Sequence, residues 1–178
     1  MRKKKCKAKG CSAKFTPVSS LQAACSVKCA MLLVNEKNDA KRKRKAKADT
    51  LKLEAIQPLS YWVKKAQAAC NAFIRERDKG DPCISCGRYH TGQYHAGHYI
   101  STGARRELRF HPANIHKQCQ PCNTHLSGNP ILYRSWLIKK VGQEMVEYLE
   151  NYNGIQKMTV DEIKDIEAHY KELLKSLR

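Results

Sequence analysis

Apolar residues recur at three- and four-residue intervals in three stretches of the chain, which is the spacing of one face of a helix. The first stretch begins at Ser60 and ends near Gly80, and Lys and Arg occupy many of its remaining positions. Its apolar members are Trp62, Val63, Ala66, Ala69, Cys70, Phe73 and Ile74. Because Cys70 lies on this stripe and has no other cysteine close to it in sequence, we interpret it as a small core residue.

Two further helices are expected in the C-terminal part. Residues 130–152 have helical spacing, although Gly142 weakens the prediction of one unbroken helix. A last helix is expected to begin at Thr159, because Thr159 and Glu162 have the spacing of a capping box. Its apolar positions are Val160, Ile163, Ile166, Tyr170, Leu173, Leu174 and Leu177. These helices either complete the core of a monomer or supply a dimer interface, and the sequence leaves both open.

Residues 83–112 lack helical spacing and are interrupted by four glycines and by Pro112. Short runs of this kind are typical of strands joined by turns. The expected strand residues are Tyr94, Tyr99, Ile100, Leu108 and Phe110. We therefore predict a small hairpin between helices, which makes the fold class α+β.

The net charge of +18 is distributed unevenly. Residues 1–48 hold fifteen Lys and Arg against two acids, whereas residues 142–178 hold five against eight. The run from Lys37 to Ala48, KNDAKRKRKAKA, predicts an exposed, helical linker. Such a basic arm favours a polyanion partner, and we expect DNA backbone contacts from Lys41, Arg42, Lys43, Arg44 and Lys45. The alternative is that these side chains only keep the protein soluble.

The chain shows no secretory signal pattern and no apolar stretch of about 18 residues that could span a bilayer. We therefore expect no membrane association and a cytoplasmic location. In that compartment nine cysteines are poor candidates for disulfides, and closely spaced pairs indicate metal binding instead.

Two short Cys-x2-Cys motifs, Cys83 with Cys86 and Cys119 with Cys122, are separated by 32 residues. Each turn brings two thiolates onto one cation, and two turns complete the closed tetrahedral site typical of structural zinc. Because such a site leaves no open coordination position, we do not expect this zinc to be catalytic. Redox pairs and incidental cysteines are the competing interpretations.

A second cysteine group lies near the N-terminus, where Cys6, Cys11, Cys25 and Cys29 fall within 24 residues. A segment this short cannot bury enough apolar surface to fold alone, so zinc binding would supply its folding free energy. We expect two structural zinc ions per chain. The function of this first unit is DNA contact or partner docking, unless it only stabilises the chain as a cap.

Histidines and asparagines gather around the second cysteine group, where a zinc staple does not need them. His98, Asn114 and Asn123 occur in the order of the HNH motif, and the two Cys-x2-Cys pairs bracket it. HNH nucleases place a His at the end of a first strand, an Asn in the following loop and a His or Asn at the start of a helix. The chain thus resembles a zinc-stapled HNH nuclease, which implies a ββα-metal core.

The resemblance extends to a narrower family. The strings SYWVKKAQAACNAFIRERD, PCISCG, AGHY, LRF, NIHKQCQPCN and HLSGN are similar to the NinG, or Rap, family of lambdoid phage recombination proteins. The resemblance covers nearly the whole chain, from the first cysteine group to the last helix. It implies a structure-specific endonuclease that acts on branched recombination intermediates, such as a Holliday junction, D-loop or flap, in the bacterial host cell.

The resemblance also implies roles for individual residues. By motif position His98 is the general base that activates water. Asn123 holds the catalytic cation, expected to be Mg²⁺ or Mn²⁺, with a helix N-cap as its competing interpretation. Asn114 fixes the loop and orients the base, and His116 reaches the phosphate or metal unless it only secures the cysteine knuckle.

HNH enzymes commonly carry an acid directly before the base histidine, and here that position is Gly97. His95 lies on the same face of an extended strand as Gly97, about 6.5 Å further along, so it is a candidate substitute ligand. A bulge at Gly97 would close that gap. An imidazole ligand shifts the metal preference from Mg²⁺ towards Mn²⁺, Ni²⁺ or Zn²⁺.

Three arginines of the predicted hairpin, Arg105, Arg106 and Arg109, are candidate phosphate clamps or, alternatively, a solvated face.

We divide the chain into an N-terminal zinc module (1–34), a basic linker (35–58), an HNH-type nuclease core with its preceding helix (59–130) and C-terminal helices (131–178). The expected function is cleavage of branched DNA. The alternatives are a non-catalytic DNA-binding recombination-accessory protein, favoured by Gly97, and an RNA nuclease. A homodimer and contacts with phage recombination proteins stay open.

Overall fold

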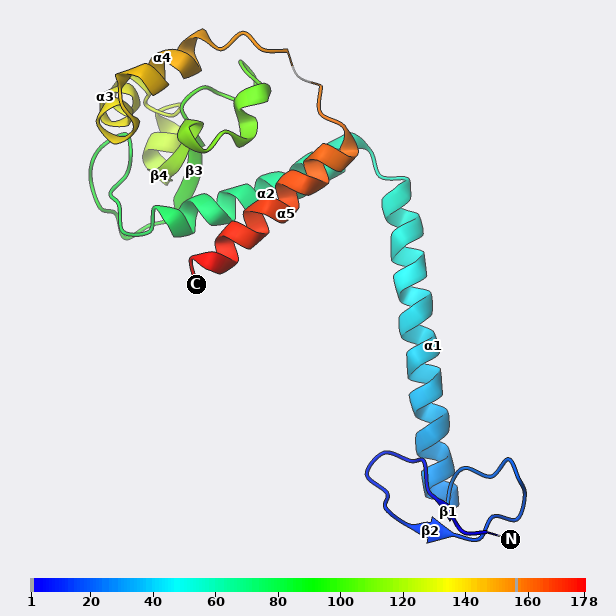
Figure 1. Cartoon of the computed structure of the whole chain (residues 1–178). Coiled ribbons are helices and arrows are strands. Elements are labelled where there is room, and N and C mark those ends of the chain that lie inside the picture. Colours follow the sequence, from blue (N-terminus) through cyan, green and yellow to red (C-terminus); the bar gives the residue numbers. More distant parts are fainter. Residues whose placement is uncertain (1, 156) are drawn as a thin grey trace. The chain divides into compact units, whose positions relative to one another are not determined.

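The protein is described by a computed structural model that covers residues 2–155 and 157–178 (Figure 1). The chain divides into two units, the first ending at Gln57 and the second running from Pro58 to Arg178. The secondary structure is mixed, with five α-helices and two two-stranded antiparallel sheets among the described residues. This agrees with the predicted α+β class. No helix in the described ranges combines the length and apolarity needed to cross a membrane.

The N-terminal unit combines a small cysteine-rich module with one long helix. Its strands β1 (Lys4–Lys5) and β2 (Lys14–Phe15) pair antiparallel. Helix α1 (Val27–Ala55) begins at the N-cap Ser26, whose side chain accepts a hydrogen bond from the Cys29 backbone N–H. No residue of α1 is buried. The residues of the predicted linker are therefore helical as far as Ala55, and the predicted boundary at residue 34 falls inside this helix.

The uninterrupted course of α1 has a simple local cause. Neither glycine nor proline occurs between Val27 and Ala55, and Pro58 follows shortly after the helix ends. Because the helix buries no apolar face, its stability cannot come from packing along its length. Its N-terminal turn is instead anchored by Cys29, which packs with the buried Cys6 and Ala24 of the module.

The second unit has a core built on two helices that lie side by side, α2 (Leu59–Arg77) and α5 (Val160–Ser176) (Figure 1). The buried face of α2 contains Trp62, Ala66, Ala69, Cys70, Phe73 and Ile74, which confirms all of its predicted apolar stripe except the half-buried Val63. Cys70 is fully buried, as expected of a core residue. Thr159 caps α5 with Glu162 in a complete capping box, as predicted.

A second cluster involves α3 (Pro130–Val141) and α4 (Gln143–Asn151). The stretch 130–152 is helical but divided at Gly142, the residue that weakened the prediction of one unbroken helix: Gly142 adopts φ 88°, a left-handed conformation that ends α3. The two helices bury Tyr133, Leu137, Val146 and Leu149 against Ile84 and Leu108. The C-terminal helices therefore complete the core of this unit.

The sheet of the second unit pairs β3 (Tyr94–His98) with β4 (Ile115–Cys119). This corrects the predicted hairpin: the second strand is 115–119, while Leu108 and Phe110 lie in the 3₁₀ helix η1 (Glu107–Phe110). Every residue of β4 is buried, so this strand has no alternation of apolar and polar residues that could reveal it. A second 3₁₀ helix, η2 (Pro112–Asn114), precedes β4, and the π-helix η3 (Pro121–His125) follows it.

Candidate metal centres and active site

The four cysteines of the second unit form a closed cluster. The Sγ atoms of Cys83, Cys86, Cys119 and Cys122 all lie within 4.8 Å of one another. A tetrahedral zinc site with bonds of about 2.3 Å requires sulfur–sulfur separations of about 3.8 Å, so the cluster could bind one zinc ion. The first pair is brought together by a tight turn, in which the Gly87 N–H donates to the Cys83 carbonyl at 2.8 Å. Gly87 has φ 66°, which glycine adopts at little cost.

Backbone amides favour the thiolate form that zinc binds. The Cys119 N–H donates to the Sγ of Cys83 at 3.3 Å. Burial opposes ionisation of Cys83, but hydrogen bonds from backbone N–H groups, that of Cys119 foremost, outweigh it and lower the pKa of its thiol. Burial instead raises the pKa of the Cys119 and Cys122 thiols.

His90, to which the HNH motif gives no role, lies beside the cysteine cluster. His90 lies with its Nε2 3.2 Å from the Sγ of Cys86, and its backbone N–H donates to the hydroxyl of Tyr94 at 2.7 Å. A group hydrogen-bonded to a ligand sulfur orients that ligand around the metal. The sequence signal for this contact is the four-residue spacing between Cys86 and His90.

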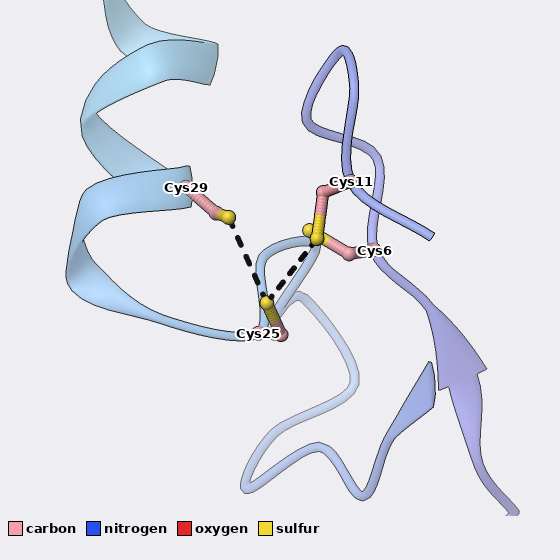
Figure 2. Close-up of side chains that lie close together, drawn as sticks. All are labelled: Cys6, Cys11, Cys25 and Cys29. Atoms are coloured by element: carbon pink, nitrogen blue, oxygen red, sulfur yellow. Dashed lines mark hydrogen bonds between the residues drawn. The ribbon is translucent and has the colours of Figure 1, made fainter. Parts of the chain in front are cut away.

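The cysteines of the N-terminal unit form a second cluster of the same kind (Figure 2). The Sγ of Cys25 lies 3.7 Å from those of Cys11 and Cys29, which matches the edge of a zinc–sulfur tetrahedron of about 3.8 Å. Cys6 supplies the fourth sulfur, and all four lie within 4.8 Å of one another. Figure 2 shows that Cys29 comes from the first turns of α1 and the other three from the loops beside it.

The two clusters predict a metal content of two zinc ions per chain. Within the described ranges, these are the only groups of three or more His, Cys, Asp or Glu ligand atoms close enough to share a cation. Elemental analysis of the purified chain should therefore give a zinc-to-protein ratio near two. A ratio of one or zero would contradict the assignment of at least one cluster.

His98 is the last residue of β3, and its ring is held by a backbone carbonyl. Its Nε2 lies 2.9 Å from the carbonyl oxygen of Arg109. Because a carbonyl can only accept, Nε2 carries the proton and the lone pair is on Nδ1. Burial lowers the pKa of His98 below its ordinary value of 6.5, although the bond to Arg109 opposes the shift. His98 is therefore neutral at pH 7, with a free basic nitrogen.

His95 and Asn123 are brought together although 28 residues separate them. The Nδ2 of Asn123 lies 3.0 Å from the Nδ1 of His95. His95 comes from β3, and Asn123 comes from the π-helix η3, directly after Cys122 of the cysteine cluster. Because alternate strand residues share a face, His95 lies on the side of Gly97 and His98 points to the other side.

Strand β3 has no bulge at Gly97. The register of β3 and β4 runs one-for-one from Tyr94 opposite Cys119 to His98 opposite Ile115. A bulge would place two residues of one strand opposite one of the other. His95 therefore keeps the spacing of a regular strand, and its proximity to Asn123 comes from the position of η3.

Asn114 is fully buried and ties the connection between the strands together. Its Oδ1 accepts from the Ile100 N–H at 2.8 Å. Its Nδ2 donates to the carbonyls of Ile100 and Leu108 at 3.0 and 3.1 Å. The segment it fixes contains Arg109, whose carbonyl orients His98. Asn114 thus acts on the histidine through the loop, in line with the expectation that it fixes this loop.

His116 lies in a buried polar network. Its Nε2 is 3.1 Å from the Ala113 carbonyl, and its Nδ1 is 2.9 Å from Arg77 and 3.6 Å from Asp78. Both ring nitrogens therefore have protein partners, as in the interpretation that His116 secures the knuckle. Burial lowers its pKa, which Asp78 only partly opposes.

Asp78, at the end of α2, is the centre of this network and was not singled out from the sequence. Its carboxylate accepts from Arg77 at 2.8 and 2.9 Å, from the Lys117 N–H at 3.0 Å and from Lys140 at 3.1 Å. Burial opposes its ionisation, but the bonds from His116 and Arg77 hold its pKa well below its ordinary value. Asp78 thereby joins α2, β4 and α3 beside the cysteine cluster.

Replacing Asp78 by alanine should lower the free energy of unfolding by about 3–5 kcal/mol, because it leaves the buried Lys117 N–H and the half-buried Arg77 side chain without their carboxylate acceptor. Urea denaturation at pH 7 measures this loss. Since the folded pKa of Asp78 is depressed, its contribution is complete above the ordinary carboxyl pKa and is lost as the pH falls through the folded value. Asp81→Ala is the matched control: its side chain is 50% exposed and also pairs with Lys140, so it should cost about 1 kcal/mol or less. Equal losses in the two variants would contradict this role.

The predicted DNA-contacting side chains lie in both units. Arg106 is exposed, whereas Arg105 donates to the Tyr152 carbonyl at 2.9 Å and Arg109 to Gln67 at 3.4 Å. The basic run of α1 is exposed throughout; it comprises Lys41, Arg42, Lys43, Arg44 and Lys45.

Comparisons with known proteins give matches over the full length of this chain. The family model described as "Bacteriophage Lambda NinG protein" matches residues 1–178. "Protein ninG" of Escherichia phage lambda is 42% identical over 191 aligned positions, which cover 99% of this chain and 94% of the relative. "Protein ninG" of Salmonella phage P22 is 41% identical with the same coverage. No solved structure shows a significant match.

Proposed function

Because this chain belongs to the NinG family of phage proteins, we propose that it is a metal-dependent DNA endonuclease of the HNH type, acting on branched recombination intermediates. The observation that carries the proposal is the state of His98. A neutral imidazole that donates through Nε2 to a carbonyl presents its lone pair on Nδ1. That is the state a general base requires before it removes a proton from water.

The proposed reaction hydrolyses one phosphodiester bond. His98 Nδ1 accepts a proton from a water molecule whose oxygen attacks the phosphorus. A new P–O bond forms, the P–O bond to the leaving sugar oxygen breaks, and that oxygen is protonated from solvent. The Arg109 carbonyl keeps His98 in the productive tautomer and stabilises the imidazolium that forms.

His95 and Asn123 are the residues proposed to hold the catalytic cation. Their donor set is one imidazole and one amide, so phosphate oxygens and waters would complete the coordination sphere. In this structure the His95 Nδ1 accepts from the Asn123 Nδ2, so a cation bound by this nitrogen would replace that hydrogen bond. An imidazole favours Mn²⁺ over Mg²⁺. When bound, the cation supplies stabilisation of the charge that develops on the phosphate and the leaving oxygen. His116, with both nitrogens already bonded, is left out of the proposed reaction.

Binding to DNA is proposed to come mainly from phosphate contacts. The net charge is +18, and the five consecutive cations of α1, residues 41–45, are all exposed. Affinity carried by such contacts falls steeply with salt and depends little on base sequence. Selection of branched DNA would then depend on shape.

Cleavage assays with labelled substrates test this function. The zinc-loaded chain, incubated with Mn²⁺ or Mg²⁺, should nick a four-way junction, a flap or a D-loop faster than a linear duplex of the same sequence. Absence of nicking on every one of these substrates in both metals would reject the proposal.

The pH dependence of cleavage follows from the state of His98. Lowering the pH protonates Nδ1 and removes the base, so the rate should fall on the acid side. Because burial depresses the pKa of His98, the midpoint of that fall should lie below 6.5, and the rate should stay level from there to about pH 8. Single-turnover rates at saturating Mn²⁺ measure the profile. A midpoint above 6.5 would contradict the assignment of His98.

A second candidate function is that of a non-catalytic DNA-binding protein of phage recombination. The observation in its favour is Gly97, which stands where HNH enzymes commonly carry an acid. That function requires tight junction binding with no cleavage in any divalent metal. The substrate panel described above therefore separates the two candidates.

A further inference from the structure

Gln118 is a buried side chain with an oxygen that nothing satisfies. Its exposed fraction is 0%, and its Oε1 is one of two buried side-chain polar atoms in the described ranges without a hydrogen-bond partner. A buried acceptor left unpaired costs about 1–3 kcal/mol, so such an atom requires an explanation. Gln118 lies directly opposite His95 in the β3–β4 register, on the same face of the sheet.

The orientation of the Gln118 side-chain amide is fixed by the hydrogen bonds of its nitrogen. The Nε2 of Gln118 lies 2.6 Å from the hydroxyl of Ser85 and donates to the Gly128 carbonyl at 2.5 Å. Because a carbonyl only accepts, this assigns the nitrogen and directs Oε1 the opposite way. Gly128 belongs to a turn of three consecutive left-handed residues: Ser127 (φ 49°), Gly128 (φ 87°) and Asn129 (φ 46°). Strain of this kind in non-glycine residues is often found at functional sites.

The unpaired oxygen points at Gly97. A Cβ built on Gly97 would lie 2.0 Å from Gln118 Oε1 and 3.0 Å from Asn123 Oδ1. The Gln118 oxygen therefore occupies the space that a side chain at position 97 would fill, and the Asn123 oxygen borders it. Since the two distances start from one point, the oxygens are within 5 Å of each other. Around Mg²⁺ or Mn²⁺, ligand oxygens are separated by roughly 3–4 Å.

We propose that Gln118 Oε1 is a third protein ligand of the catalytic cation, together with His95 and Asn123, and replaces the acid that is missing before His98. Position 97 is then glycine because the amide of the neighbouring strand occupies the space of its side chain. This inference rests on the proposed function and deepens it. It also accounts for a buried acceptor that would otherwise be unsatisfied.

Binding of Mn²⁺ to the zinc-loaded chain, followed by electron paramagnetic resonance, tests the proposal without using activity. Hard Mn²⁺ does not compete with zinc for thiolates, so it reports on the second site. Gln118→Met keeps a similar volume and removes the oxygen, and it should weaken Mn²⁺ binding at least about tenfold. Gly97→Ala should do the same by displacing the amide. Gly92→Ala is the matched control, because nothing lies within 4 Å of its Cβ position, and it should bind Mn²⁺ like the parent.

A double variant keeps the test decisive if a single variant does not fold. In the double variant, Gln118→Ala makes room at position 97 and Gly97→Asp places a ligand oxygen on the residue before His98. Mn²⁺ binding should therefore recover relative to Gln118→Met. Parent-like Mn²⁺ affinity in a folded Gln118→Met chain, with both zinc ions present, would overturn the proposal, as would no Mn²⁺ binding by the double variant.

The two proposals fail in distinguishable ways. If the parent binds Mn²⁺ through Gln118 but cuts no DNA, the nuclease function is wrong and the cation site stands. If the parent cuts branched DNA and Gln118→Met binds Mn²⁺ as the parent does, the function stands and the role of Gln118 is wrong.

Discussion

Replacing His98 by alanine is expected to reduce cleavage of branched DNA by about 100- to 10,000-fold while leaving DNA affinity unchanged. This is the range by which a positioned general base accelerates proton transfer. His98 is half-buried and its Nε2 is bound to the Arg109 carbonyl, so its loss removes the base without altering the basic surface of the protein. Single-turnover cleavage of a labelled four-way junction, with gel-shift affinity measured in parallel, separates the two effects.

His125→Ala is the matched control for this variant. His125 lies in η3, close in sequence to Asn123, but its side chain is exposed. It should cut at close to the parental rate, with at most a small change in affinity. If His98→Ala cuts as fast as the parent, the mechanism proposed for this protein is wrong.

Replacing Cys119 by serine is expected to unfold the second unit and to reduce the zinc content from two to one per chain. Cys119 is 1% exposed and sits at the end of β4, where its backbone N–H also bonds the Sγ of Cys83. Structural zinc contributes about 10–16 kcal/mol of apparent binding free energy, which exceeds the stability of a domain of this size. Elemental analysis together with thermal unfolding followed by circular dichroism measures both consequences.

Cys70→Ser provides the comparison for this loss. Cys70 is also fully buried, but it lies on the α2 face that packs against α5 and belongs to neither cysteine cluster. It should lower the melting temperature moderately and retain both zinc ions. A Cys119→Ser chain that keeps two zinc ions and the parental melting temperature would refute the zinc assignment of this cluster.

The local elements of this protein could be predicted because their signals are local. The apolar stripe of α2, the capping box of α5 and the helical course of the basic run depend on residues within one or two turns of each other. The cysteine clusters were predictable for a similar reason: each pair is fixed by a short turn, and four sulfurs around one cation leave few alternatives.

The features that the sequence did not predict depend on contacts between residues that are distant in sequence. Strand β4 pairs with β3 along one edge and packs against α2, and all of its residues are buried, so it shows no alternating pattern. The roles of Asp78 and Gln118 arise from partners up to 62 residues away, Lys140 for the first and Ser85 for the second. Both residues lie in strings that resemble the family, but the HNH motif gives neither of them a role. A buried polar network becomes visible only when the fold brings its members together.

The central claim is that the zinc clusters and the hydrolytic site are separate, and one metal-exchange measurement tests it most directly. The purified chain is freed of loosely bound cations, its zinc content is determined, and cleavage of a four-way junction is followed as Mn²⁺ is added. We expect no cleavage before the addition and cleavage that rises with Mn²⁺, while the zinc content stays at two per chain. No cleavage at any Mn²⁺ concentration, or cleavage that follows the zinc content alone, would contradict the claim.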